Sequence, residues 1–248
     1  MNKSAKYWGE QFFSGLWNEV QVKMFSKAQT FEHIKFIIDV LKLKRKDKIL
    51  DIPCGDGRIS NVLAKKGMDI TGVDINPVML KRAVKFTKEN KLKSEFIKKN
   101  MWEIDFENEF NAAICFWGSF GYFDDDVNRK FLEKVYKALK PGGKFLVDMH
   151  TVETLLTIFQ PNGWFKAGDI LVTEYRSYDV FNSRINSDWT LIKKGKIENK
   201  TVSIRLYSYK ELNNILQDIG FKPVKSYGTI HKDEFNKGSR RLYMVVKK

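Results

Sequence analysis

The stretch "KILDIPCGDGRIS", residues 48–60, decides the fold of this 248-residue chain. It begins as a short apolar run, typical of a buried strand, and then turns through Gly55 and Gly57. The next residues, 58–67, place apolar side chains at helical spacing. A turn of this kind presents the free N–H groups of a helix N-terminus to a ligand. We therefore expect a binding site where the first strand ends.

The alternation of strands and helices continues from this turn to residue 150. Apolar runs predict strands at 68–75, 94–99, 110–118 and 143–150, with helices at 76–90 and 125–140 and two more before residue 44. Near-continuous apolar strands between helices indicate a parallel sheet with helices on both faces. The chain ends with a helix at 207–220 and two strands joined without a helix, which must pair antiparallel if they are neighbours. We predict an α/β fold with a seven-strand, mostly parallel sheet whose last strand is antiparallel.

A different pattern occupies residues 169–206. Three alternating runs are separated by turn signals at Asn182-Ser183 and at Gly195. They predict a small three-stranded antiparallel insertion after the fifth strand of the main sheet.

The composition is that of a folded protein, with 43% hydrophobic residues and a net charge of +14. The excess charge comes mostly from lysines spread along the chain, which favours a solvated surface over a nucleic-acid track but leaves RNA binding open. No apolar stretch predicts a membrane span or a signal peptide, so a cytoplasmic location is expected. Cys54 and Cys115 have no metal-ligand spacing with the histidines, and we expect no metal. The expected oligomeric state is a monomer or a homodimer.

The acidic residues around the glycine turn distinguish between possible ligands. A P-loop is excluded because no Gly-Lys-Ser/Thr follows, and "GDGRIS" matches the dinucleotide fingerprint only in part. Asp51, four residues before Gly55, would repel a pyrophosphate but would favour an ammonium group. Asp74 ends the second strand at the distance where a carboxylate accepts hydrogen bonds from a ribose diol. A ligand with an amino-acid zwitterion and a nucleoside is S-adenosylmethionine.

Four segments resemble the class I (Rossmann-like, seven-strand) S-adenosylmethionine-dependent methyltransferases, and the resemblance covers residues 30–248. They are "LDIPCGDGRIS", "GVDINPVML", "KALKPGGKFLVD", and the final pair "RLYSYKELNNILQDIGF" and "SRRLYMVVKK". One departure is Pro53, which stands where that family usually has its first glycine. The resemblance implies a helical lid at 1–29, a cofactor-binding domain formed by 30–150 and 207–248, and an insertion at 151–206 that covers the acceptor.

The same resemblance implies which residues bind the cofactor, whose product is S-adenosylhomocysteine. The methionine end would lie against Asp51, Cys54 and Gly55, the ribose against Asp74, and the adenine against Ile75, Asn100 and Met101. Pro53 and Gly57, in the same turn, are also expected to bind the cofactor. Phe116 would form the floor of the methyl-transfer site, and Tyr7 and Trp8 would close over the cofactor.

Residues for the methyl acceptor are expected at the end of the fourth strand and in the insertion. The candidates are Trp117, Trp164, Tyr175, Trp189, Arg205 and Tyr207, with His150 and His231 as possible bases. The expected activity is methyl transfer to a nitrogen or oxygen of a small molecule. The alternatives are a tRNA or rRNA methyltransferase, a dinucleotide oxidoreductase, and a cofactor-binding protein without catalysis.

Overall fold

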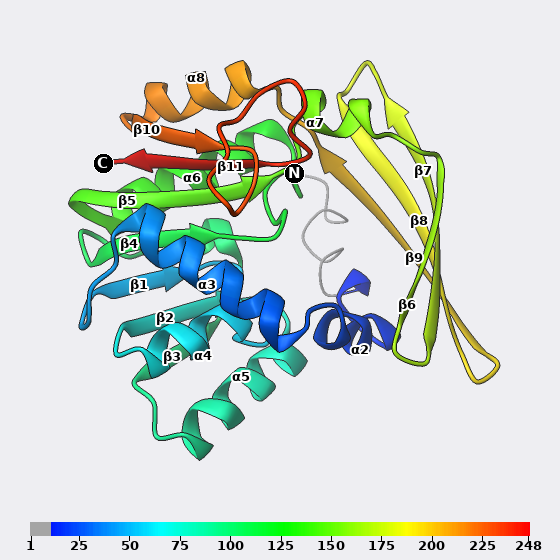
Figure 1. Cartoon of the computed structure of the whole chain (residues 1–248), viewed down its shortest axis with the longest axis horizontal. Helices are drawn as coiled ribbons and strands as arrows, with labels where there is room; N and C mark the ends of the chain where they lie inside the picture. Colours follow the sequence, from blue (N-terminus) through cyan, green and yellow to red (C-terminus); the bar gives the residue numbers. More distant parts are fainter. Residues whose placement is uncertain (1–10) are drawn as a thin grey trace.

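The structure, a computed structural model, describes residues 11–248 and contains two β-sheets (Figure 1). The larger sheet has seven strands in the order β10-β11-β5-β4-β1-β2-β3. β11 pairs antiparallel with both β5 and β10, whereas the pairs among β1 to β5 are parallel. This architecture confirms the predicted fold class. The strands are β1 (Lys48–Asp51), β2 (Asp69–Asp74), β3 (Ser94–Lys98), β4 (Phe110–Cys115), β5 (Leu139–Met149), β10 (Lys222–Tyr227) and β11 (Leu242–Lys247).

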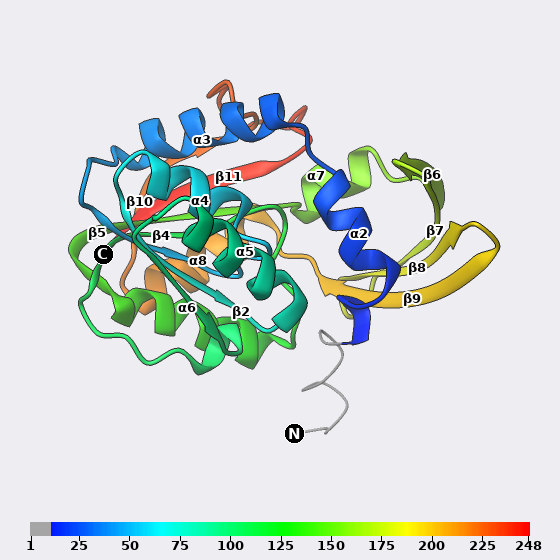
Figure 2. The same cartoon turned by 90° about the horizontal axis from the view of Figure 1, so that it is seen from below.

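Helices cover both faces of this sheet (Figure 2). On one face, α3 (Lys27–Leu41) and α4 (Arg58–Lys65) bury apolar side chains against the strands, and α5 (Pro77–Glu89) packs beside α4. On the other face, α6 (Asp125–Ala138) and α8 (Tyr209–Ile219) form the second half of the core. Strands buried on both faces explain the near-continuous apolar runs of the sequence.

The insertion after β5 begins with the short helix α7 (Val152–Thr157) and forms an antiparallel sheet of four strands, one more than predicted. The strands are β6 (Asn162–Ala167), β7 (Ile170–Asp179), β8 (Arg184–Lys193) and β9 (Lys196–Arg205). β6 was not predicted, because its six residues begin with Asn-Gly, a pair that is typical of a turn. It joins β7 through the two-residue turn Gly168-Asp169.

Helix α2 (Leu16–Lys23) lies against the small sheet, close to the carboxyl edge of the large one (Figure 1). Leu16, Trp17 and Val20 pack on the apolar face of β7, β8 and β9. The side-chain amide of Asn76, which caps α5, also donates to the Phe13 carbonyl at 2.7 Å and to Asn18 Oδ1 at 2.9 Å. One side chain therefore joins the domain of the large sheet to the N-terminal segment.

Tyr7 and Trp8, predicted to close over the cofactor, lie outside the described residues. Among residues 11–248, no helix is both long enough and apolar enough to span a bilayer.

Candidate active site

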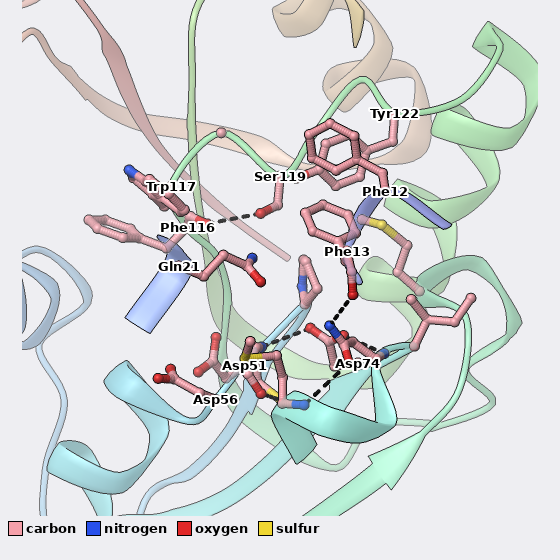
Figure 3. Close-up of a pocket in the computed structure, with 18 of the residues that line it drawn as sticks. Phe12, Phe13, Gln21, Asp51, Asp56, Asp74, Phe116, Trp117, Ser119 and Tyr122 are labelled. Atoms are coloured by element: carbon pink, nitrogen blue, oxygen red, sulfur yellow. Dashed lines mark hydrogen bonds between the residues drawn. The ribbon is translucent and has the colours of Figure 1, made fainter. Parts of the chain in front are cut away.

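A cavity of about 350 Å³ opens at the carboxyl edge of the large sheet. Its walls come from the turns after β1 to β4, from α2 and the residues before it, and from the inner face of β8 and β9. Figure 3 shows the carboxylates of Asp51, Asp56 and Asp74 gathered on one side and a group of aromatic rings on the other. The cavity therefore combines an acidic floor with an aromatic roof, and its volume lies in the range of small-molecule sites.

The two glycines of the turn have different roles. Gly55 lines the cavity with φ +56°, and a Cβ atom added there would meet no atom within 4 Å. Its backbone is therefore open to a ligand. Gly57 caps α4 with φ +77°, and a Cβ there would lie 2.6 Å from Asn61 Nδ2 and 2.9 Å from Ala83 Cβ. Gly57 thus allows α4 and α5 to pack closely, and it does not line the cavity.

Asp74 connects the ends of β1 and β2. Its Oδ2 accepts the main-chain N–H of Gly55 at 2.7 Å, and its Oδ1 accepts that of Asn76 at 2.8 Å. The carboxylate is buried, and burial raises its pKa. A carboxylate has about four acceptor sites, so beside its backbone donors Asp74 can still accept from a ribose diol.

Asp51 is almost fully buried at the end of β1 and lines the cavity. Ser60 Oγ donates to its Oδ2 at 2.6 Å. Burial raises the pKa of Asp51 to about 7, well above its ordinary value of 3.8. A buried carboxylate of this kind is stabilised in its charged form by a cation, which fits the ammonium group of an amino acid.

The turn after β4 is held in an unusual conformation. Trp117 has φ +67° and Gly118 has φ +72°, and positive φ is rare for a bulky side chain. The carboxylate of Asp148 accepts the Trp117 N–H at 2.6 Å, and its main-chain carbonyl accepts the Gly118 N–H at 3.0 Å. Asp148 also forms an ion pair with the guanidinium of Arg241. Asp148 therefore fixes both the turn and a buried arginine beside the cavity.

His150 lines the cavity, whereas His231 is exposed and lies outside it. Nε2 of His150 lies 3.1 Å from Nη1 of Arg241. Because a guanidinium only donates, Nε2 must be the acceptor and the ring proton must be on Nδ1. Burial and the charge of Arg241 lower the pKa of His150 to about 4, so the ring is neutral at pH 7.

The structure gathers most of the predicted cofactor residues around this cavity. Those that line it are Asp51, Pro53, Cys54, Gly55, Asp74, Ile75, Asn100, Met101 and Phe116, together with Trp117, Trp189 and His150. The acidic, apolar and open-backbone groups needed for an ammonium, an adenine and a close ligand approach are all present. The residues therefore fit S-adenosylmethionine.

Four predicted acceptor residues lie elsewhere. Trp164 and Tyr175 project from the face of the small sheet opposite α2 and are 72% and 55% exposed. Arg205 pairs with Asp125 and Glu211 outside the cavity. Tyr207 is buried, and its hydroxyl donates to Asp125 Oδ1 at 2.6 Å, so it belongs to the core.

Several cavity residues were not predicted individually. They are Phe12, Phe13, Trp17, Gln21, Met24 and Phe25 from the N-terminal segment, and Asp56, Arg58, Ser119, Tyr122 and Arg241 from the large domain. Apolar spacing predicts two helices before residue 44, but spacing alone does not show which face of a helix meets the ligand. Arg241 offered no signal, because only the tertiary fold brings the start of β11 to the ends of β4 and β5.

Comparisons with known proteins agree with this site. A family model described as a methyltransferase domain matches residues 49–143. A protein of Geobacillus sp. (strain WCH70) named as a methyltransferase is 32% identical over 114 residues, so that the match spans about half (46%) of each chain. YqeM of Bacillus subtilis (strain 168), also named as a methyltransferase, is 27% identical over 83% of this chain and 86% of its own length.

Solved structures share the fold over nearly the whole chain. An S-adenosylmethionine-dependent methyltransferase from Clostridium acetobutylicum ATCC 824 has a TM-score of 0.79 at 19% identity, covering 88% of this chain and 91% of its own. The 1,6-didemethyltoxoflavin-N1-methyltransferase of Burkholderia thailandensis was solved with 1,6-didemethyltoxoflavin and S-adenosylhomocysteine. It has a TM-score of 0.63 at 17% identity, and the match covers 99% of this chain and 89% of its own. With its glycine turn, its Asp74 and its reversed β11, the chain is an S-adenosylmethionine-dependent methyltransferase with the class I fold.

Proposed function

We propose that this enzyme transfers the methyl group of S-adenosylmethionine to a nitrogen or oxygen of a small-molecule acceptor. The observation that carries the proposal is the continuity of one cavity from Asp51 and Asp74 to the aromatic roof of α2 and β8. A cavity of about 350 Å³ with aromatic walls favours a compact ligand over a polynucleotide. The likeness to a methyltransferase solved with a small molecule supports the same acceptor class.

The cofactor-binding side chains can be assigned to the parts of S-adenosylmethionine. Asp51 would bind the ammonium group, Asp74 the ribose hydroxyls, and Ile75 and Met101 the adenine. When bound, the cofactor supplies a methyl group on a sulfonium, which is already a good leaving group. The protein then has to align the acceptor with that methyl group and exclude water. Phe116 and Trp117, after β4, would form the wall along which the acceptor approaches.

General base catalysis by His150 does not form part of this proposal. Its Nε2 accepts a hydrogen bond from Arg241, and its Nδ1 carries the proton. In this state the ring has no free lone pair to remove a proton. An amine acceptor needs no strong base, because its lone pair is available for attack.

An RNA methyltransferase is the second candidate, because the net charge is +14. Binding of RNA through many lysines would weaken steeply as salt is raised, whereas binding of a small acceptor inside the cavity would change little. The two candidates can therefore be separated by measuring methyl transfer to total tRNA and to pooled metabolites at two salt concentrations.

The test of the proposal combines binding with turnover. Calorimetry is expected to detect S-adenosylhomocysteine but not a nicotinamide dinucleotide, and Asp74→Ala should weaken the binding. Formation of S-adenosylhomocysteine with a pooled metabolite fraction would support a small acceptor. Failure of S-adenosylhomocysteine to bind would refute the cofactor site, whereas binding without turnover on any acceptor would favour a non-catalytic protein.

A further inference from the structure

We infer that the methyl acceptor carries a carboxylate and that Arg241 binds this group in the cavity. The inference rests on the methyl transfer proposed above and adds the chemical class of the substrate. Arg241 directly precedes β11 and lines the cavity from the edge where β4 and β5 end.

Two nitrogens of the Arg241 guanidinium have partners in the protein, and the third, Nη2, is free to donate. Its Nε pairs with Asp148, and its Nη1 donates to His150 Nε2. Nη2 has no acceptor among residues 11–248 and lies 2.9 Å from where a Cβ atom on Gly118 would be. The Arg241 side chain lines the cavity and is only 19% exposed, so it is largely shielded from solvent. A carboxylate is the natural partner of such a donor.

Asp148 meets the guanidinium at Nε and not at Nη2. One oxygen pairs with Arg241 Nε, and the other accepts the Trp117 N–H at 2.6 Å. The ion pair thus orients the guanidinium before a ligand arrives, which lowers the entropy cost of binding. The orientation is further secured by the turn at Trp117 and Gly118, which Asp148 also holds.

His150 lies in the same wall and accepts from Nη1 of Arg241. Its Nδ1 is buried, so the ring adds no further acceptor for the guanidinium. A carboxylate can accept from Nη2, because its oxygens have free lone pairs. A cationic group placed against Arg241 would instead be repelled. The polarity of this wall therefore favours an anionic group on the acceptor over an ammonium.

The test uses the full chain saturated with S-adenosylhomocysteine. The probes are pairs of small amines and phenols, each pair consisting of a carboxylic acid and its primary amide, for example anthranilate with anthranilamide and 4-hydroxybenzoate with 4-hydroxybenzamide. Affinities are measured by calorimetry for the wild type, Arg241→Met and Arg241→Lys. Arg240→Met is the matched control, because Arg240 is the neighbouring arginine, is exposed and does not line the cavity.

In the wild type and in Arg240→Met, at least one acid is expected to bind about tenfold more tightly than its amide, the effect of one charged hydrogen bond. Arg241→Met should remove this preference, and Arg241→Lys should retain part of it. Arg241→Met leaves the buried carboxylate of Asp148 without its ion-pair partner, which can destabilise the protein. The double variant Asp148→Asn/Arg241→Met removes both charges, and it should also lose the preference for the acid.

The outcomes separate this inference from the proposed function. If S-adenosylhomocysteine itself does not bind to the wild type, the proposed function fails. If it binds but no acid is preferred over its amide, the carboxylate inference alone is wrong. The inference is also overturned if Arg241→Met and the double variant keep the preference, or if they lose S-adenosylhomocysteine, since Arg241 would then serve the cofactor.

Discussion

The carboxylate of Asp74, at the end of β2, accepts the main-chain N–H of Gly55 in the turn after β1 at 2.7 Å. The residue assigned to the ribose therefore also holds the turn that lies against the cofactor. Gly55 has φ +56°, so its N–H is presented by a backbone that an L-residue seldom adopts. Removal of the carboxylate should thus affect both the ligand contacts and the shape of the turn.

Asp74→Ala is expected to weaken S-adenosylhomocysteine binding by about 100-fold, because two charged hydrogen bonds to a ribose are each worth roughly tenfold. Asp74→Asn should lose less, since its amide oxygen can still accept from one partner. Calorimetry measures both. Asp218→Ala, an exposed carboxylate on α8, is the control and should bind as the wild type does. If Asp74→Ala binds S-adenosylhomocysteine as tightly as the wild type, Asp74 does not contact the cofactor.

Alanine substitutions at the two glycines should separate binding from stability. In Gly55→Ala the new Cβ meets no protein atom, so we expect only the cost of a left-handed backbone, about 1–2 kcal/mol. Gly57→Ala adds a clash with Asn61 and Ala83 and should lower the free energy of unfolding by about 2–4 kcal/mol. Urea unfolding gives the stabilities.

Cofactor affinity completes the comparison of the two glycines. Gly55→Ala should bind S-adenosylhomocysteine at least about tenfold more weakly despite its smaller effect on stability, because its methyl group enters the cavity. Equal stability losses in the two variants would contradict the separate roles of these glycines.

The sequence predicted the sheet and the floor of the cavity because both depend on local patterns. Apolar runs marked the buried strands, and the spacing of Asp51, Gly55 and Asp74 follows directly from a strand, a turn and a helix. The acceptor residues are set by tertiary structure instead. Which face of β7 meets α2 depends on register, and a slip of one residue would exchange Tyr175 with its neighbours. Arg241 reaches the cavity only through sheet order.

Tyr207→Phe tests the assignment of Tyr207 to the core. The hydroxyl donates to Asp125 at 2.6 Å and accepts from Asn128 Nδ2 at 3.1 Å. Its loss should lower the free energy of unfolding by about 1 kcal/mol, the net worth of a typical hydrogen bond. Acceptor KM should stay unchanged, whereas Trp189→Phe, at the cavity wall, should raise it. A raised acceptor KM in Tyr207→Phe would show that Tyr207 belongs to the acceptor site.

Asp51 gives the cofactor-free protein a pH-dependent stability. Its pKa is raised by burial to about 7 in the folded state, from an ordinary value of 3.8. Between these two values the folded state holds a proton that the unfolded state has released, so the contribution of Asp51 to stability falls as pH rises from about 4 to 7. Urea unfolding of Asp51→Asn, which cannot ionise, should lack this component. An identical pH dependence in both proteins would contradict it.

The same ionisation should control cofactor binding in the opposite direction. An ammonium group is stabilised by the charged carboxylate, so S-adenosylhomocysteine affinity is expected to rise from pH 6 to pH 8 and to level off above the pKa of about 7. Binding at pH 7 should therefore release about half a proton, measurable by calorimetry in two buffers with different ionisation enthalpies. In Asp51→Asn the affinity should be lower and independent of pH across this interval, with no proton release from this site. Proton uptake in the wild type, or a pH dependence preserved in Asp51→Asn, would show that another group near the turn binds the ammonium.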